Sequence, residues 1–190
     1  MLTNGEDIHR SFSFDPSGQK LIYTSNKRNK KDFDLYIMNP DEPQSEELLL
    51  ELEGSWSISS WSPESDKILI SRYISVNENE VYMLDIQSKS LTPFDSNIEE
   101  AVSYGRGVFS KDGKKIYYTS DYNSEFKRLR IRDLNTGADS ILSTKIQWDI
   151  SNIKSSEDGK FLGLSVNEGG VDELILYDTE KGTFEKIEGL

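Results

Sequence analysis

Hydrophobic positions along the chain fall in short runs separated by turns rich in Gly, Pro, Asp and Asn. The run Arg10–Phe14 alternates polar and apolar residues, which is typical of a strand with one buried face. The runs Leu35–Met38 and Ile116–Tyr118 are almost continuously apolar, as strands covered on both faces are. No stretch of useful length shows the period of an amphipathic helix. The pattern therefore predicts an all-β protein.

One motif recurs four times and sets the phase of these strands. It is clearest in Phe109–Tyr118, where an extended entry, an Asp-Gly turn and an aromatic-rich strand follow one another. Asp-Gly favours a tight hairpin because Gly tolerates positive φ and Asp can accept a hydrogen bond from the backbone two residues on. The turn position lies at residues 18, 65, 113 and 159, at intervals of 47, 48 and 46 residues, and an Asp turn follows at residues 85, 133 and 178.

A period in the forties with four short strands per repeat is the signature of a β-propeller blade. We therefore expect a single propeller segment over residues 1–190, built from four blades of four antiparallel strands. The expected blades span residues 9–54, 55–100, 101–146 and 147–190, and residues 1–5 are expected to end a preceding blade. In the first blade, Asn39–Pro43 is expected to break the chain before a fourth strand over Glu47–Leu52.

The aromatic residue before each turn is expected to pack between blades. This position holds Phe14, Trp61 and Phe109 in the first three repeats. The fourth repeat has Ser155 there, so either Ile153 compensates or the contact between the last two blades is weaker.

Composition and charge limit the possible partners. The net charge of −12 repels phosphate, so a nucleic-acid partner is not expected. The absence of cysteine removes disulfides, thiolate catalysis and cysteine zinc sites, and fits a reducing compartment. No run approaches the roughly 18 apolar residues of a membrane span. We therefore expect a cytoplasmic protein with no membrane partner.

One basic run departs from the acidic balance. Lys27, Arg28, Lys30 and Lys31 lie in the loop between the second and third strands of the first repeat. The run is interpreted as a solvated loop, and the alternatives are a nuclear-targeting or an anion-binding role.

The sequence offers no set of catalytic residues. A Ser-His-Asp triad needs a histidine base, and the one histidine, His9, is expected to be an ordinary loop or strand-edge residue. Carboxylates are numerous, but turn chemistry already explains Asp15, Asp112, Asp158, Asp85, Asp133 and Asp178, which leaves a propeller hydrolase with paired carboxylates as a remote hypothesis. Asp121–Glu125 has alternating oxygen ligands, but Phe126 and Arg132 replace the Gly and Glu that a calcium loop of the EF-hand type requires. We expect no catalytic residue, no metal site and no cofactor.

Several stretches, taken in their order along the chain, resemble a known family over nearly the whole chain. They are Lys31–Met38, Trp56–Pro63, Tyr73–Glu78, Tyr104–Lys114, Asp121–Leu129, Ile146–Asp149 and Val166–Gly169. The single repeats resemble TolB-type, WD-like blades with the pattern Phe-Ser-Pro-Asp-Gly-Lys followed by Leu-Tyr-x-x-Asp. The series of stretches between the blades, in this order, is similar to the N-terminal propeller of the prolyl oligopeptidase family of serine peptidases.

The resemblance to this family implies a function for the propeller. In that family a seven- or eight-bladed propeller precedes an α/β-hydrolase domain, caps its active site and restricts access to short peptides. The nucleophile elbow of that domain, Gly-x-Ser-x-Gly, does not occur in this chain. The nearest stretch, Gly163–Asn167, lacks the second glycine, so no catalytic residue of the family can be assigned here.

The loops between second and third strands are the candidate interaction sites, because they vary in length and charge while the strands keep phase. They are Asn26–Asp32, Arg72–Glu80, Asp121–Lys127 and Asn167–Asp172. The residues expected to face a partner domain or a peptide are Arg72, Tyr73, Asn77, Asp121, Tyr122 and Glu125. The alternative is that these loops are solvated hairpin tips.

Two functional hypotheses follow. The first is a non-catalytic propeller segment that gates and docks on the α/β-hydrolase domain of a prolyl oligopeptidase-like parent chain. The second is a freestanding TolB-like propeller that acts as a protein–protein interaction module. In both cases a blade buries its faces only against its neighbours, so the outer faces of the first and last blades are expected to promote self-association.

Overall fold

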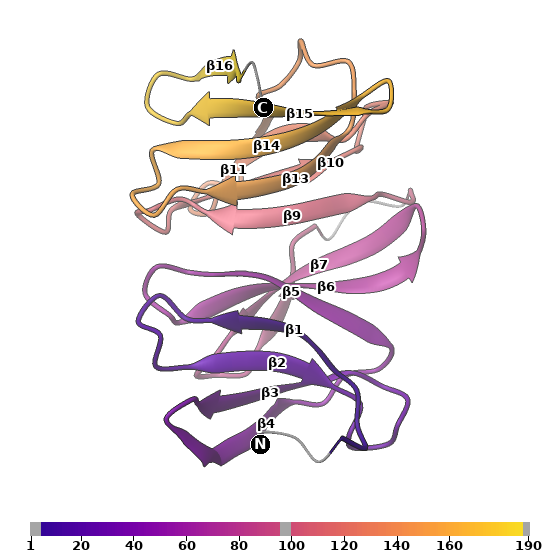
Figure 1. Cartoon of the computed structure of the whole chain (residues 1–190), viewed down its shortest axis with the longest axis vertical. Helices are drawn as coiled ribbons and strands as arrows, with labels where there is room; N and C mark the ends of the chain where they lie inside the picture. The colour runs from indigo at the N-terminus through magenta and orange to yellow at the C-terminus, as the bar shows by residue number, and fades with distance from the viewer. Residues whose placement is uncertain (1–4, 96–99, 188–190) are drawn as a thin grey trace. The chain divides into compact units, whose positions relative to one another are not determined.

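The computed structural model describes residues 5–95 and 100–187, and every regular element in these ranges is a β-strand (Figure 1). The chain divides into two compact units, residues 1–100 and 101–190, and each is described by itself. The described residues form no helix, and so none that is long and apolar enough to cross a membrane. The predicted end of a preceding blade, residues 1–5, lies outside the described residues apart from Gly5.

The first unit contains two four-stranded sheets in which strands pair with their chain neighbours in antiparallel order. The first sheet consists of β1 (His9–Phe14), β2 (Leu21–Ser25), β3 (Asp34–Asn39) and β4 (Glu42–Leu50). The second consists of β5 (Ser55–Trp61), β6 (Lys67–Ser75), β7 (Glu78–Asp85) and β8 (Leu91–Pro93).

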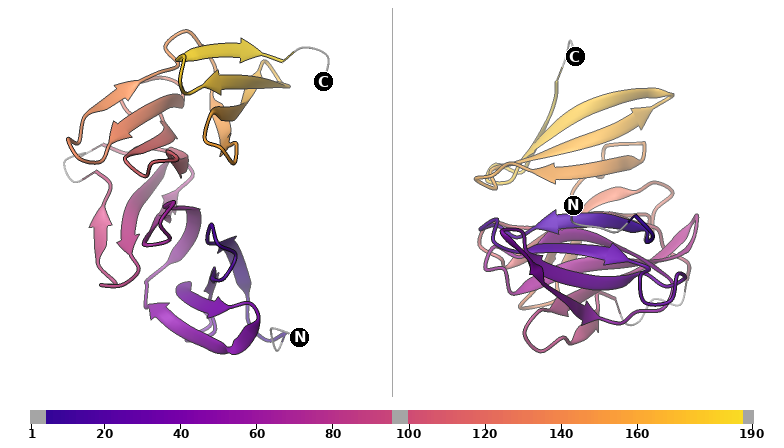
Figure 2. Two further views of the ribbon diagram at one scale, coloured as in Figure 1. Left: turned by 90° about the vertical axis from the view of Figure 1, so that its left-hand side faces the viewer. Right: turned by 60° about the horizontal axis from the view of Figure 1, so that its bottom comes forward.

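The second unit repeats this plan. Its first sheet consists of β9 (Tyr104–Phe109), β10 (Lys115–Ser120), β11 (Arg128–Asp133) and β12 (Asp139–Ile141). Its second consists of β13 (Ile150–Ser155), β14 (Phe161–Glu168), β15 (Val171–Asp178) and β16 (Thr183–Lys186). Figure 2 shows this last sheet in orange and yellow with the twist usual for short antiparallel sheets. Four sheets of four antiparallel strands confirm the predicted fold class.

The repeated turn has the same backbone geometry in every sheet. Its turn position has positive φ at Gly18, Ser65, Gly113 and Gly159. In each case the N–H of that residue donates to the carbonyl three residues earlier, at 2.9–3.0 Å. Glycine adopts positive φ without steric cost, so the motif uses it in three of the four repeats.

The fourth strand of the first sheet begins earlier than predicted. β4 starts at Glu42, so Pro43 lies inside a strand where the sequence predicted a break. The prediction was wrong because β4 is an edge strand: Pro lacks an N–H donor, but an edge strand has one side without a ladder partner. The register between β3 and β4 also shifts at two places, which accommodates the extra residues.

Each sheet has two faces, which we name from the register of its first two strands. The leading face carries the residue before the turn, which is Phe14, Trp61, Phe109 or Ser155. The trailing face carries, on the second strand, Ile22, Leu69, Tyr117 or Gly163.

In the first unit, the trailing face of the first sheet packs on the leading face of the second. The core between them includes Ile22 and Leu35 from the first sheet, and Trp61, Ile68 and Ile70 from the second. Full burial of such a side chain contributes about 1.5–3 kcal/mol. This apolar seam therefore holds the first unit together.

The second unit has a seam of the same kind. Its core includes Tyr117 and Leu129 from the trailing face of one sheet, and Ile153, Leu164 and Tyr177 from the leading face of the next. Ile153 is fully buried in this core, which favours the prediction that it compensates for the small side chain at Ser155.

Candidate interaction surfaces

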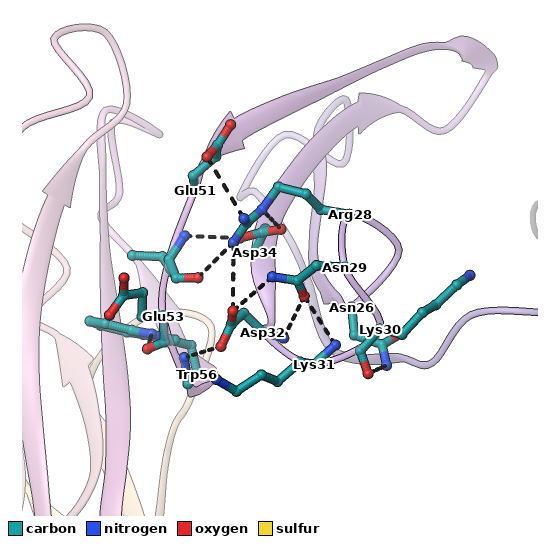
Figure 3. A network of polar contacts seen from close by, with 12 residues as sticks. Asn26, Arg28, Asn29, Lys30, Lys31, Asp32, Asp34, Glu51, Glu53 and Trp56 are labelled. Atoms are coloured by element: carbon teal, nitrogen blue, oxygen red, sulfur yellow. Dashed lines mark hydrogen bonds and ion pairs between the residues drawn. The ribbon is translucent and has the colours of Figure 1, made fainter.

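The basic loop of the first unit is tied to the segment that leads into the second sheet (Figure 3). Arg28 lies over Asp34 and donates from Nε to Oδ2 at 2.8 Å and from Nη2 to Oδ1 at 3.0 Å. The same Nη2 donates to the carbonyl of Leu52 at 3.1 Å, and the N–H of Leu52 donates to Asp34 at 2.9 Å. Hydrogen bonding to the fully buried Asp34 raises the pKa of Arg28.

A second carboxylate, that of Asp32, also ties this loop to the segment that leads into the second sheet. Asp32 accepts hydrogen bonds from the N–H of Gly54 at 2.9 Å and from Asn29 Nδ2 at 2.8 Å. These hydrogen bonds, that of Gly54 first, lower the pKa of Asp32. The N–H of Phe33 also donates to the carbonyl of Gly54. The loop is therefore part of the joint between the two sheets of this unit (Figure 3).

Two other basic side chains of the run also have acidic partners. Lys27 forms an ion pair with Glu46 and lies 3.9 Å from the ring centroid of Tyr36, and Lys30 forms an ion pair with Asp7. With Arg28 bound to Asp34, three of the four cations are paired within the unit. These contacts favour a structural role over the anion-binding alternative.

The hairpin between β6 and β7 is the candidate surface of the first unit. At its base, Arg72 faces Glu80 with 3.4 Å between Nη1 and Oε2, and the hydroxyl of Tyr82 donates to Glu80 at 2.9 Å. The Tyr82 ring packs against Trp56 with 5.3 Å between centroids. Burial, and then the hydrogen bond to Glu80, raise the pKa of Tyr82. Arg72 is therefore held at the base of the hairpin.

The tip of this hairpin is apolar and exposed. Tyr73 and Asn77, both predicted to face a partner, are exposed, and so are Ile74 and Val76, which the prediction did not include. Among the described residues, Val76 is the most exposed large hydrophobic residue, at 84%. Exposed apolar side chains grouped on one hairpin are typical of an interaction surface.

In the second unit, the loop 121–127 holds the other predicted residues. Asp121 accepts a hydrogen bond from the N–H of Ser103 at 2.8 Å, as Asn26 does from Ile8 at 2.9 Å in the first unit. Asp121 therefore has a structural role that repeats between blades. The carbonyl of Tyr122 accepts a hydrogen bond from Arg130 at 3.1 Å, and Glu125 is exposed.

Three arginines next to this loop were missed by the sequence reasoning. Arg128, Arg130 and Arg132 alternate along β11 and share the leading face of its sheet. Asp139 pairs with Arg130 at 2.7 Å and with Arg132 at 3.2 Å. Arg128 is 9% exposed and donates to Ser124 at 3.1 Å, while its Nη1 has no hydrogen-bond partner among the described residues. The Arg-x-Arg-x-Arg spacing could have revealed this group.

The turn aspartates are structural. Asp133 accepts from the N–H and hydroxyl of Thr136, and Asp178 from the N–H groups of Glu180 and Lys181. Such hydrogen bonds hold the carboxylate in its charged form and lower its pKa. The pKa is lowered at all six predicted turn positions, which are Asp15, Asp85, Asp112, Asp133, Asp158 and Asp178. The general acid of a carboxylate pair needs a raised pKa, so these residues do not suit that role.

The single histidine lies in a strand. His9 begins β1 and packs edge-on against Tyr23 with 5.6 Å between ring centroids. Among the residues that the structure describes, no group of three His, Asp or Glu side chains could hold a metal ion.

Comparisons with known proteins identify the fold. No protein-family model matches the chain, and no curated protein matches it by sequence. Its structure is similar to that of TolB from Acinetobacter baumannii, with 19% identity and a TM-score of 0.78 over 97% of this chain and 44% of that one. It is also similar to a puromycin-hydrolyzing peptidase of Mycobacterium tuberculosis, with 12% identity and a TM-score of 0.73 over 96% of this chain and 31% of that one.

A third similar structure comes from a study of two prolyl endopeptidases, with 11% identity and a TM-score of 0.63 over 98% of this chain and 36% of that one. The chain thus spans less than half the length of each of these three proteins. At these identities the similarity establishes the fold, which is a β-propeller segment of the kind found in TolB and in prolyl peptidases.

Proposed function

We propose that this chain is a non-catalytic propeller segment that docks on, and gates access to, the α/β-hydrolase domain of a prolyl oligopeptidase-like serine peptidase. Its similarity to a puromycin-hydrolyzing peptidase and to a prolyl endopeptidase structure supports a peptidase parent. Two observations support the non-catalytic part: the one histidine packs against Tyr23, and the lowered pKa values of the turn aspartates do not suit a general acid.

The exposed apolar tip of the hairpin between β6 and β7 is the observation that supports docking. Its side chains Tyr73, Ile74 and Val76 are exposed, while backbone pairing of β6 with β7 holds the two strands together and Arg72 faces Glu80 at the base. A rigid hairpin with an apolar end can bury that end against another domain at little cost in conformational entropy.

A binding experiment tests this docking. The chain is added to a separately produced α/β-hydrolase domain of a prolyl endopeptidase, and the affinity is measured by calorimetry. Replacing Tyr73 and Val76 by Ser is expected to weaken binding by at least tenfold, because truncated apolar anchors cost more than 1 kcal/mol each at an interface centre. Val171→Ser, a change at an exposed apolar residue of the second unit, is the matched control. Equal binding by all variants would refute docking through this hairpin.

The second candidate function is a freestanding interaction module. It is supported by the high TM-score with TolB, and it needs no hydrolase domain. If the chain does not bind the hydrolase domain but the same hairpin variants lose binding to another protein, this second function is the correct one.

A further inference from the structure

The seam within each unit pairs its faces in the same way. In each unit, the leading face of the second sheet packs on the trailing face of the first. In the first unit, Trp61 Nε1 donates to the carbonyl of Ser13 at 3.4 Å, and the N–H of Ile58 donates to Ser11 Oγ at 2.6 Å. In both units the first strand of the second sheet contacts the first and second strands of the sheet before it. In both units, therefore, a leading face has a trailing face as its partner.

The leading face of the first sheet exposes large aromatic side chains. Phe14 occupies the position of Trp61 in the repeat, yet it is 53% exposed, whereas Trp61 is 7% exposed in its seam. Phe12, two residues earlier on β1, is 75% exposed. The inner strands of this face are already covered, since Tyr23 and Tyr36 are buried. The exposed apolar surface is thus concentrated on β1, the strand that would enter a seam.

The trailing face of the last sheet has a hollow at the matching place. Where the first and third sheets fill the seam with Ile22 and Tyr117, this sheet has Gly163. The cavity has a volume of about 390 Å³. Its lining comes from β13, β14 and β15 and includes Lys154, Phe161, Ser165, Leu174 and Leu176.

The backbone does not require glycine at this position. Gly163 has no positive φ, and an added Cβ would lie 3.8 Å from the Lys154 carbonyl and 3.9 Å from Leu174, which are ordinary contacts. Neither backbone strain nor crowding therefore explains the missing side chain. A hollow beside Leu174 and Leu176 suits an aromatic ring supplied from outside.

We propose that the Phe12–Phe14 ridge of one copy inserts into the Gly163 hollow of a second copy and forms a seam of the same type. The contact is heterologous, because the two surfaces belong to different sheets of the chain. If it closes after two copies, the assembly contains eight sheets. The inference does not depend on the proposed gating of a peptidase.

Charge sets the conditions under which this contact forms. Each copy carries a net charge of −12, so two copies repel each other at low ionic strength. Added salt screens this repulsion and leaves the apolar contact in place. Association is therefore expected to strengthen as salt is raised, which is the opposite of a contact made by ion pairs.

Two variants test the two surfaces separately. Phe14→Ser places on β1 the residue that the fourth repeat has at this position, Ser155, and it changes an exposed side chain. Gly163→Leu fills the hollow with a side chain like those at the same position in the first two sheets. Val171→Ser removes an exposed apolar side chain that is not among the residues lining the hollow, and it is the control. Circular dichroism establishes that each variant keeps its fold.

Sedimentation velocity in moderate salt measures association. The unchanged chain and Val171→Ser are expected to associate, whereas Phe14→Ser and Gly163→Leu each weaken association at least tenfold. Mixing these two variants is expected to restore a complex, because one supplies an intact hollow and the other an intact ridge. A chain that stays monomeric, variants that associate normally, or a mixture that fails to restore the complex would overturn the proposal.

Discussion

Removing the Asp34 carboxylate should show how firmly the basic loop holds the first unit. Asp34 is fully buried and accepts two hydrogen bonds from Arg28 and one from the N–H of Leu52. In Asp34→Ala, that N–H loses its acceptor, which costs about 1–3 kcal/mol for a buried group. The guanidinium also loses its counter-charge, and breaking a buried pair costs about 3–5 kcal/mol.

These two costs are not independent and should not be summed. The Arg28 side chain is 32% exposed and keeps its hydrogen bond to the Leu52 carbonyl, so water can solvate part of the freed charge. We therefore expect Asp34→Ala to lower the free energy of unfolding by about 3 kcal/mol, near the lower end for a buried pair. Asp34→Asn should cost less, because an amide oxygen can still accept from Leu52.

Urea unfolding followed by tryptophan fluorescence is the assay, because Trp56 and Trp61 both lie in the core of this unit. Arg28→Met alone and combined with Asp34→Ala completes a double-mutant cycle, which isolates the free energy of the pair. A loss below about 1 kcal/mol for Asp34→Ala, or additive single effects, would refute the structural role of this loop.

Three further predictions concern the turns and the seams. Gly18→Ala should lower the free energy of unfolding by about 1 kcal/mol, since φ is +73° and no neighbouring atom contributes a clash; urea unfolding measures it. Leu164→Ala, in the fully buried core of the second unit, should cost about 2–5 kcal/mol in the same assay. The pKa of turn carboxylates such as Asp112 is lowered from 3.8 in the folded state. The charged carboxylates therefore stabilise the fold fully above pH 3.8, and this contribution is lost as the pH falls below it. The midpoint of thermal unfolding should decrease below about pH 4.

The sequence predicts the repeat well because its signals are local. Positive φ at Gly113 and hydrogen bonds to Asp133 are properties of short segments, so residue identity and spacing suffice to find the turns. The position of Trp61 in a seam also follows from the period, since the same strand recurs in each blade. The earlier start of β4 was missed because a Pro in an edge strand looks like a chain break in the sequence.

The interaction surfaces depend on contacts that the sequence does not encode locally. Arg28 and Leu52 are joined only because the fold brings the loop and the inter-sheet segment together. The hollow at Gly163 becomes visible only when the register shows that the first and third sheets have Ile22 and Tyr117 at this position. Ile74 and Val76 lie between the predicted residues Tyr73 and Asn77, so the sequence alone could have added them to the predicted site.

The most direct test of the proposed function compares substrates of different length. The chain is titrated into an isolated α/β-hydrolase domain of a prolyl endopeptidase, and the turnover of a short proline peptide and of an unfolded protein is measured in parallel. A gating propeller segment should reduce cleavage of the protein to a saturating extent and leave cleavage of the short peptide nearly unchanged. Equal effects on both substrates, or no effect on either, would contradict the account.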